Sequence, residues 1–81
     1  MISELQTVHK VIGVKQSRKA VRDGEAQTVF VALDAEPRVM KPIRELCEQM
    51  QVPIREVETM AELGSAVAID VGAAVVTLLK K

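Results

Sequence analysis

Cationic residues with helical spacing mark the stretch from Gly13 to Ala20 as the part of this sequence best suited to bind an anion. Four basic residues recur at i, i+3, i+4 and i+7 and would share one face of a helix: Lys15, Arg18, Lys19 and Arg22. Between His9 and Arg22 the sequence has neither Asp nor Glu. Such a face is suited to phosphate groups, although a solvated helix surface has the same pattern.

The start of this predicted helix carries groups that could also read a nucleic-acid base. Lys15 and Gln16 have N–H donors of the kind that pair with O6 and N7 of guanine. The free backbone N–H groups of a helix N-terminus would act on the same phosphate or base edge. The types and spacing of these residues therefore favour an anion-binding face.

Charge is unevenly distributed along the chain, although the formal net charge is zero. Residues 1–22 have five Lys or Arg against one Glu, a balance of +4, and residues 23–81 have six against ten acids, a balance of −4. A local basic patch on a neutral protein indicates a bounded anionic partner. With one Phe and neither Tyr nor Trp, the chain is not expected to hold a nucleic acid mainly by aromatic stacking.

Residues that could catalyse a reaction or bind a cofactor are not arranged to do so. His9 has no base or second ligand at a useful spacing, and the lone Cys47 has the position of a core residue on an apolar helix face. Gly13 and Gly24 form neither a GxGxxG pattern nor a P-loop. We therefore expect no catalytic residue, no metal site and no cofactor.

The length and the N-terminal residues predict the number of domains and the cellular location of the protein. Eighty-one residues are expected to form one domain, spanning residues 1–81. The single cysteine excludes an intramolecular disulfide, and the first residues show no signal-peptide pattern. Because no apolar run approaches the ~18 residues of a membrane span, we expect a cytoplasmic protein without membrane contact.

Two short helices are predicted in the first third of the chain, and they must position the basic face. A capping box of Ser3 and Gln6 would start the first, which includes His9, has an apolar face of Leu5, Val8 and Ile12 and ends at Gly13. An ending through a few extended residues at 12–14 stays open as an alternative. The second is expected from about Gln16 to Asp23, with Gly24 as its C′ residue. Its buried side would be Ala20 and Val21.

Strands and helices alternate in the remainder of the sequence. The apolar run at residues 28–33 predicts a strand covered on both faces, and Asp34 could cap the helix that follows at about 38–51. Pro42 favours a late or irregular start for that helix. A strand at 54–57, a helix capped by Thr59 and a strand at 73–79 complete the pattern. This order predicts an α/β protein with an α/β/α sandwich.

Six segments of the chain together resemble the ribosomal L7Ae/L30e family of kink-turn RNA-binding proteins, and most closely its small bacterial members. In order along the chain they are GVKQSRKA (13–20), ALDAEP (32–37), LC (46–47), VP (52–53), LG (63–64) and IDVG (69–72). The resemblance implies a three-layer α/β/α sandwich with a four-stranded mixed sheet. It also implies binding to the kink-turn, a sharply bent RNA with a bulge and tandem sheared G·A pairs.

The resemblance assigns roles to particular residues of the basic segment. The family pattern Gly-x-Asn-Glu-x-x-Lys, whose polar pair lies on exposed guanine edges, matches Gly13, Lys15, Gln16 and Lys19. Asn-Glu has become Lys-Gln, which replaces an acceptor carboxylate with an amide and adds a positive charge. Phosphates would be neutralised by Lys19 together with Arg18 and Arg22.

A second set of residues matches the family positions around the bulge and its extruded base. The loop Ile69, Asp70 and Val71 corresponds to the second RNA-contacting segment. Positions bordering the pocket for the base are Glu36, Pro37 and Met40. Without the resemblance, Ile69 and Val71 would be read as core and Pro37 as a helix start. A basic residue that some members place near this pocket corresponds to Met60 here.

The partner expected from the resemblance is structured RNA with a kink-turn, in ribosomal or messenger RNA. DNA is not expected as a partner, and the protein is expected to be a monomer. Whether the protein is a ribosomal component or a free RNA-binding protein stays open. Two other classes also stay open: a protein–protein module using the acidic second part of the chain, and a small-ligand or nucleotide-binding protein without a recognisable motif.

Overall fold

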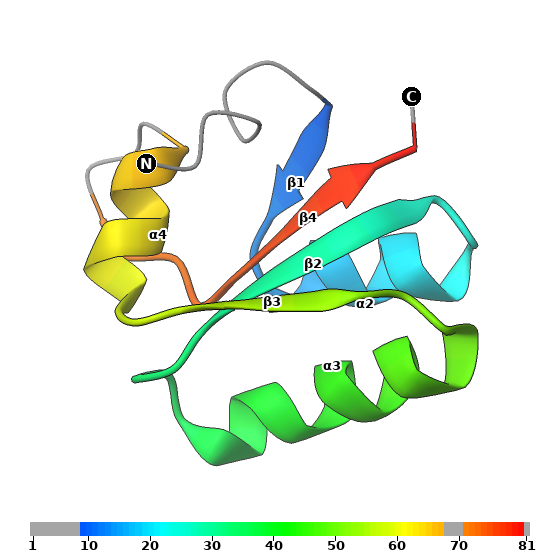
Figure 1. The fold of residues 1–81 in the computed structure, drawn as a ribbon, viewed down its shortest axis with the longest axis horizontal. Helices are drawn as coiled ribbons and strands as arrows, with labels where there is room; N and C mark the ends of the chain where they lie inside the picture. Colours follow the sequence, from blue (N-terminus) through cyan, green and yellow to red (C-terminus); the bar gives the residue numbers. More distant parts are fainter. Residues whose placement is uncertain (1–8, 68–70, 81) are drawn as a thin grey trace.

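Four strands form one mixed sheet in the order β1-β4-β2-β3 (Figure 1). The computed structural model describes residues 9–67 and 71–80. The strands are β1 (Lys10–Ile12), β2 (Ala26–Ala32), β3 (Ile54–Val57) and β4 (Val75–Leu79). β2 is parallel to β3, whereas β4 is antiparallel to both of its neighbours, β1 and β2. The predicted four-stranded mixed sheet is thereby confirmed.

Helices cover both faces of this sheet, as the sequence predicts for an α/β/α sandwich. α2 (Val14–Arg22) and α3 (Pro37–Met50) pack against each other on one face. α4 (Met60–Ala66) lies on the other face, against β2 and β3 (Figure 1). Coverage on both sides explains why β2 has an unbroken apolar run: Val29, Phe30, Val31 and Ala32 are all fully buried.

Side-chain contacts of β2 and β3 show which residues face each layer. Arg55 pairs with Phe30 across the two strands, and its guanidinium carbon lies 5.2 Å from the centre of the Phe30 ring. The next residue, Glu56, points to the opposite face, where its carboxylate lies 3.1 Å from the guanidinium of Arg44 in α3. Both ends of that ion pair are partly exposed, so packing of aliphatic side chains contributes more to the stability of this layer.

The expected first helix does not extend to Ile12. Residues 1–8 of that prediction lie outside the described residues, but Ile12 belongs to β1 and pairs with Val76. His9, expected on the same helix, directly precedes β1, and its carbonyl accepts the Leu79 N–H at 2.9 Å. The helix prediction was wrong for His9, and the extended alternative holds for Ile12. Pairing with a strand more than 60 residues away supplies the backbone hydrogen bonds that local patterns assign to a helix.

α3 also begins differently from the prediction. The helix starts at Pro37, so Pro42 lies inside it and does not delay its start. Pro37 occupies the first helical position, where a proline has the required φ and needs no N–H partner. Pro42 removes the hydrogen bond to the carbonyl of Arg38, but both residues are exposed, so that solvent can hydrate this carbonyl. Gln51, with φ of 58°, ends the helix in the left-handed conformation.

Other predicted elements are confirmed within a few residues. α2 begins two residues before the expected position, Gly24 follows its end with φ of 77°, and Ala20 and Val21 are buried. In α4 the Thr59 hydroxyl accepts the Glu62 N–H at 3.0 Å, as expected for its N-cap.

Cys47 has the core position that its place on an apolar helix face predicts. Its side chain is fully buried in the hydrophobic core. Burial raises the pKa of the Cys47 thiol, and the positive charge of Arg44 opposes this effect only in part. The neutral thiol is therefore the form that the folded protein holds, as expected of an inert core residue.

Candidate nucleic-acid interface

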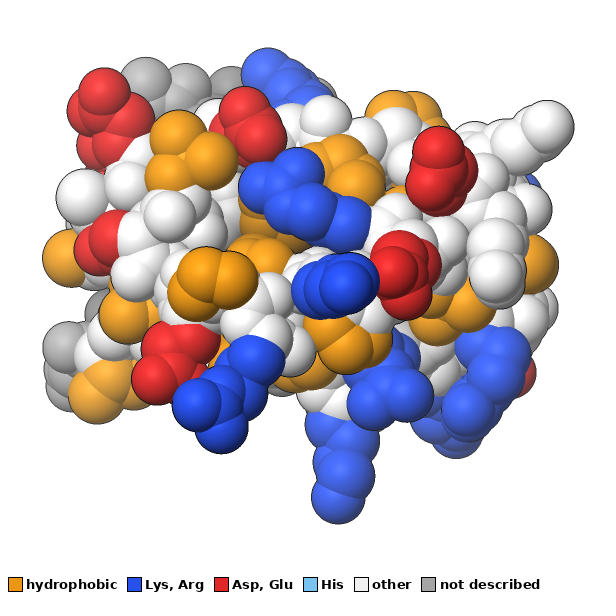
Figure 2. Space-filling model, turned by 90° about the horizontal axis from the view of Figure 1, so that it is seen from below, with side chains coloured by type: hydrophobic (Ala, Val, Ile, Leu, Met, Phe, Trp, Pro, Cys, Tyr) orange, Lys and Arg blue, Asp and Glu red, His pale blue; other side chains and the backbone are white. Residues whose placement is uncertain are grey.

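The outer face of α2 has the cationic surface that the spacing of its residues predicts. Five side chains are exposed and line a shallow groove of about 440 Å³: Lys15, Gln16, Arg18, Lys19 and Arg22. Figure 2 shows the side of the molecule that α2 and α3 cover, with Lys and Arg side chains gathered along its lower edge. The buried residues Ser17, Ala20 and Val21 hold the inner side of the helix against the sheet.

The N-terminus of α2 offers backbone donors next to these side chains. Gly13 is the N-cap, and no side chain in the described part of the chain caps this helix. Its first turn contains no acidic residue, whereas Lys19 and Arg22 lie in the last turn, where cations stabilise a helix. The partial positive charge of the helix start and the Lys15 ammonium group therefore add to each other, an arrangement that favours an anion.

Three connecting segments meet at one end of the sheet, next to the start of α2. Since β4 lies antiparallel between β1 and β2, its first residues adjoin the last residues of both neighbours. The Gly13 N–H donates to the Val75 carbonyl at 2.8 Å, and the Ala32 N–H donates to the Ala74 carbonyl at 2.9 Å. The β1–α2 junction, the β2–α3 turn and the segment that leads into β4 thus form one edge of the molecule (Figure 1).

Apolar side chains are exposed at this same end. Val71 is 71% exposed in the segment before β4, and Leu33 is 53% exposed in the turn after β2. Glu36 and Pro37, both predicted site residues, are exposed at the start of α3, whereas Met40 is only 5% exposed. The remaining predicted site residues, Ile69 and Asp70, lie outside the described residues. Leu33 was not among the predicted residues, because its apolar side chain reads as the end of a buried strand.

Asp34 makes a different contact from the predicted one. The N-cap of α3 is Glu36, so the expectation that Asp34 caps this helix was wrong. Instead, Asp34 Oδ1 accepts the backbone N–H of Met60, at the start of α4, at 2.8 Å. The two residues are 26 positions apart, so local sequence patterns could not predict the bond. The carboxylate still lies at the positive end of a helix, as a negative charge prefers.

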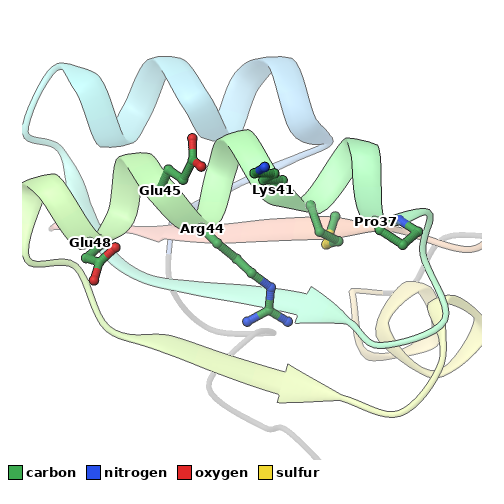
Figure 3. Close-up of a pocket in the computed structure, with 6 residues that line it drawn as sticks. Pro37, Lys41, Arg44, Glu45 and Glu48 are labelled. Carbon is green, nitrogen blue, oxygen red and sulfur yellow. The ribbon is translucent and has the colours of Figure 1, made fainter.

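A second groove, of about 310 Å³, follows the outer surface of α3 (Figure 3). It is lined by Pro37, Met40, Lys41, Arg44, Glu45 and Glu48. In Figure 3 Arg44 points toward β3, where it meets Glu56, and Glu45 points toward α2. Because this groove carries two basic and two acidic side chains, it lacks the single sign of charge that makes α2 suited to an anion.

Side chains that could bind a metal do not converge in the described ranges, 9–67 and 71–80. No three His, Cys, Asp or Glu side chains there are placed to hold an ion. His9 lies with Glu25, Leu79 and Lys80 in a small hollow at the other end of β4. In the same ranges, no helix has the length and apolar character required to cross a lipid bilayer.

Comparison with known proteins gives the class to which this fold and surface belong. Residues 4–81 match the model of the ribosomal protein L7Ae/L30e/S12e/Gadd45 family. Since the match covers nearly the whole sequence, the chain belongs to this family, as the six sequence segments had indicated.

Individual relatives give a finer comparison. The chain is 45% identical over 75 residues to RNA-binding protein BH0128 of Halalkalibacterium halodurans, covering 93% of this chain and 92% of the relative. It is 40% identical over 76 residues to RNA-binding protein YbxF of Geobacillus stearothermophilus, with coverage of 94% and 93%. Among solved structures, the 15.5kD RNA binding protein of Giardia lamblia superposes with a TM-score of 0.84 at 27% identity, covering 89% of this chain and 61% of that one.

The backbone conformation at Gly13, just before α2, is predicted to require glycine. With φ of 107° and ψ of 159°, Gly13 has a conformation that is nearly exclusive to glycine, although a Cβ atom would meet nothing within 4 Å. Gly13→Ala is therefore expected to lower the free energy of unfolding by about 1–3 kcal/mol, measured by urea denaturation. Gly24→Asn is the control, because Asn tolerates the left-handed region, and should cost about 1 kcal/mol or less. Equal stability of Gly13→Ala and wild type would contradict the strain argument.

Proposed function

We propose that this protein binds RNA and recognises the kink-turn, stabilising its bent form. The observation that carries the proposal is the position of the α2 cationic face directly beside the exposed apolar segments at one end of the sheet. A kinked RNA offers complementary groups: phosphates brought close by the bend, guanine edges in an opened groove and an unstacked base. Membership of the L7Ae family and the names of the relatives support the RNA-binding part of this proposal.

The α2 face supplies two kinds of contact in this proposal. Lys15 and Gln16, in the first turn, donate to guanine O6 and N7 at the sheared G·A pairs. Arg18, Lys19 and Arg22 continue along the same helix and neutralise phosphates. The Gln16 amide has an acceptor oxygen as well as donors, so it can also accept a hydrogen bond from a guanine amino group.

The apolar end of the sheet receives the bulge. Val71 covers the unstacked nucleotides, and Glu36 and Pro37 border the pocket for the extruded base. Ile69, which the sequence predicts for the same role as Val71, lies outside the described residues. Met40, the third predicted residue of this pocket, is buried and contributes to it from below the surface. An unstacked base has lost its stacking partners, so an exposed apolar surface can take their place.

Kinking follows from differential binding. The protein can shift an RNA toward the bent form only by contacting that form better than the extended one. Separate contacts to the guanine edges and to the extruded base meet this condition, because they lie at the correct separation only when the RNA is bent.

A binding titration tests the proposal directly. The protein is titrated against a fluorescent kink-turn RNA and against the same RNA with its G·A pairs replaced by Watson–Crick pairs. We expect tighter binding to the kink-turn, together with a rise in energy transfer between dyes on its two arms as the RNA bends. Equal affinity for the two RNAs would refute kink-turn recognition. If the protein bound neither RNA, RNA recognition itself would be refuted.

The phosphate role of Lys19 is tested by the salt dependence of binding. Lys19→Ala should weaken binding to the kink-turn and reduce the slope of log K against log salt by about one. Lys80→Ala is a matched control, since this exposed lysine lies at the opposite end of β4. A slope that is unchanged in Lys19→Ala would exclude the phosphate contact.

Base reading by Gln16 predicts a loss that depends on the RNA. Gln16→Ala should cost about 1–3 kcal/mol of binding free energy on the kink-turn, measured by titration calorimetry. On the RNA whose G·A pairs are replaced, the same substitution should have little effect, because the guanine edges are no longer presented. Similar losses on both RNAs would show that Gln16 contributes only a nonspecific contact.

A further inference from the structure

One residue at the start of α4 is bonded to both apolar segments at the end of the sheet. The backbone N–H of Met60 donates to Asp34 Oδ1 in the turn after β2, at 2.8 Å. The carbonyl of Met60 accepts the N–H of Ala73, in the segment before β4, at 3.0 Å. The first residue of α4 therefore holds the β2–α3 turn on one side and the segment before β4 on the other.

Two glycines hold that second segment closely against α4. A Cβ atom on Gly64 would collide with the carbonyl oxygen of Val71 and lie 3.1 Å from the Cα of Gly72. A Cβ atom on Gly72 would lie 3.0 Å from Cβ and 3.2 Å from the carbonyl carbon of Met60. Neither glycine has a positive φ, so these positions require glycine for lack of space and not for backbone conformation.

α4 itself is held in place by capping and by burial in the core. Thr59 caps it through a side-chain hydrogen bond, and Leu63 is fully buried in the core. By contrast, Leu33 and Val71, which the two segments carry, are largely exposed and have little packing of their own to hold them. Backbone hydrogen bonds from Ala32 to Ala74 and from Leu33 to Val57 anchor the strand ends of these segments. The bonds to Met60 and the close approach at Gly64 add the contacts that join both segments to α4.

We propose that Asp34, Gly64 and Gly72 are positioning residues that set the separation between the β2–α3 turn and the segment at Val71. They determine affinity for the extruded base of a bulged RNA without touching it. This inference rests on the proposed function, because it assigns the surface between these two segments to that base. Of these three residues, Asp34 can be substituted with the smallest effect on folding, since its side chain lies on the surface and not in the core.

The test compares Asp34→Ala and Asp34→Asn on two RNAs: a kink-turn, and the same kink-turn with an abasic nucleotide at the extruded position. Asp34→Ala should weaken binding to the intact RNA by about tenfold, the size of one hydrogen bond to a charged group, and by less than about twofold on the abasic RNA. Asp34→Asn keeps an oxygen that can accept the Met60 N–H, so it should retain most of the affinity.

Each other outcome has a definite meaning. Equal losses on both RNAs, or no rescue by Asn, would overturn the positioning role of Asp34. Failure of the wild-type protein to distinguish a kink-turn from an RNA without G·A pairs would instead overturn the proposed function. Hydrogen exchange gives a readout without RNA: Asp34→Ala should speed exchange at the Met60 and Ala73 amides and leave Val29, in the middle of β2, unchanged.

Gly64→Ala is the independent second variant. Displacement of the Val71 carbonyl should again lower affinity for the intact RNA more than for the abasic RNA. Ser65→Ala, at the exposed neighbouring position of α4, is the matched control for the change in helix propensity. Circular dichroism melting establishes that each variant is folded at the temperature of the titration. Equal affinity of folded Gly64→Ala and wild type for the intact RNA would overturn the role of this close approach.

Discussion

The antiparallel position of β4 between β1 and β2 is the constraint on which the rest of the structure depends. It places the beginning of the last strand beside the ends of two strands that precede it by more than 40 residues. Hydrogen bonds from Gly13 to Val75 and from Ala32 to Ala74 fix this arrangement. The start of α2, the turn before α3 and the segment at Val71 consequently share one edge, and without β4 in this place the cationic and apolar surfaces would have no common boundary.

In α2 the charges that suit an anion lower the stability of the helix start, and other residues of the same helix compensate. Lys15 lies in the first turn, where a cation opposes the helix dipole, and no acidic residue is there to compensate. The local cost is about 0.3–1 kcal/mol at an exposed position. Burial of Ala20 and Val21 against the sheet offsets it, together with Lys19 and Arg22 at the favourable end. A helix start that departs from the usual charge preference is what an anion-binding surface requires.

Two departures from the sequence predictions have the same physical origin. Ile12 was placed at the end of a helix, with an extended ending as the alternative, and lies in β1. Asp34 was expected as a cap of α3 and instead accepts a hydrogen bond from α4. In both cases the local signal was sound: a capping box before Ile12, and an acidic residue just before a helix. The partner that decided the outcome, Val76 or Met60, comes from a distant part of the chain. Local hydrogen-bonding preferences are worth about 1 kcal/mol, so one long-range backbone pairing can override them.

The amino-acid sequence by itself determined the α/β alternation, the two-sided burial of β2, the core position of Cys47 and the common face of Lys15, Arg18, Lys19 and Arg22. These features follow from periodicity, which is a property of neighbouring residues. Only the tertiary structure decided that α4 ties the Asp34 turn to the segment at Val71, and that Leu33 is exposed beside them. The physical reason is that these contacts join segments brought together by sheet order, which no local pattern encodes.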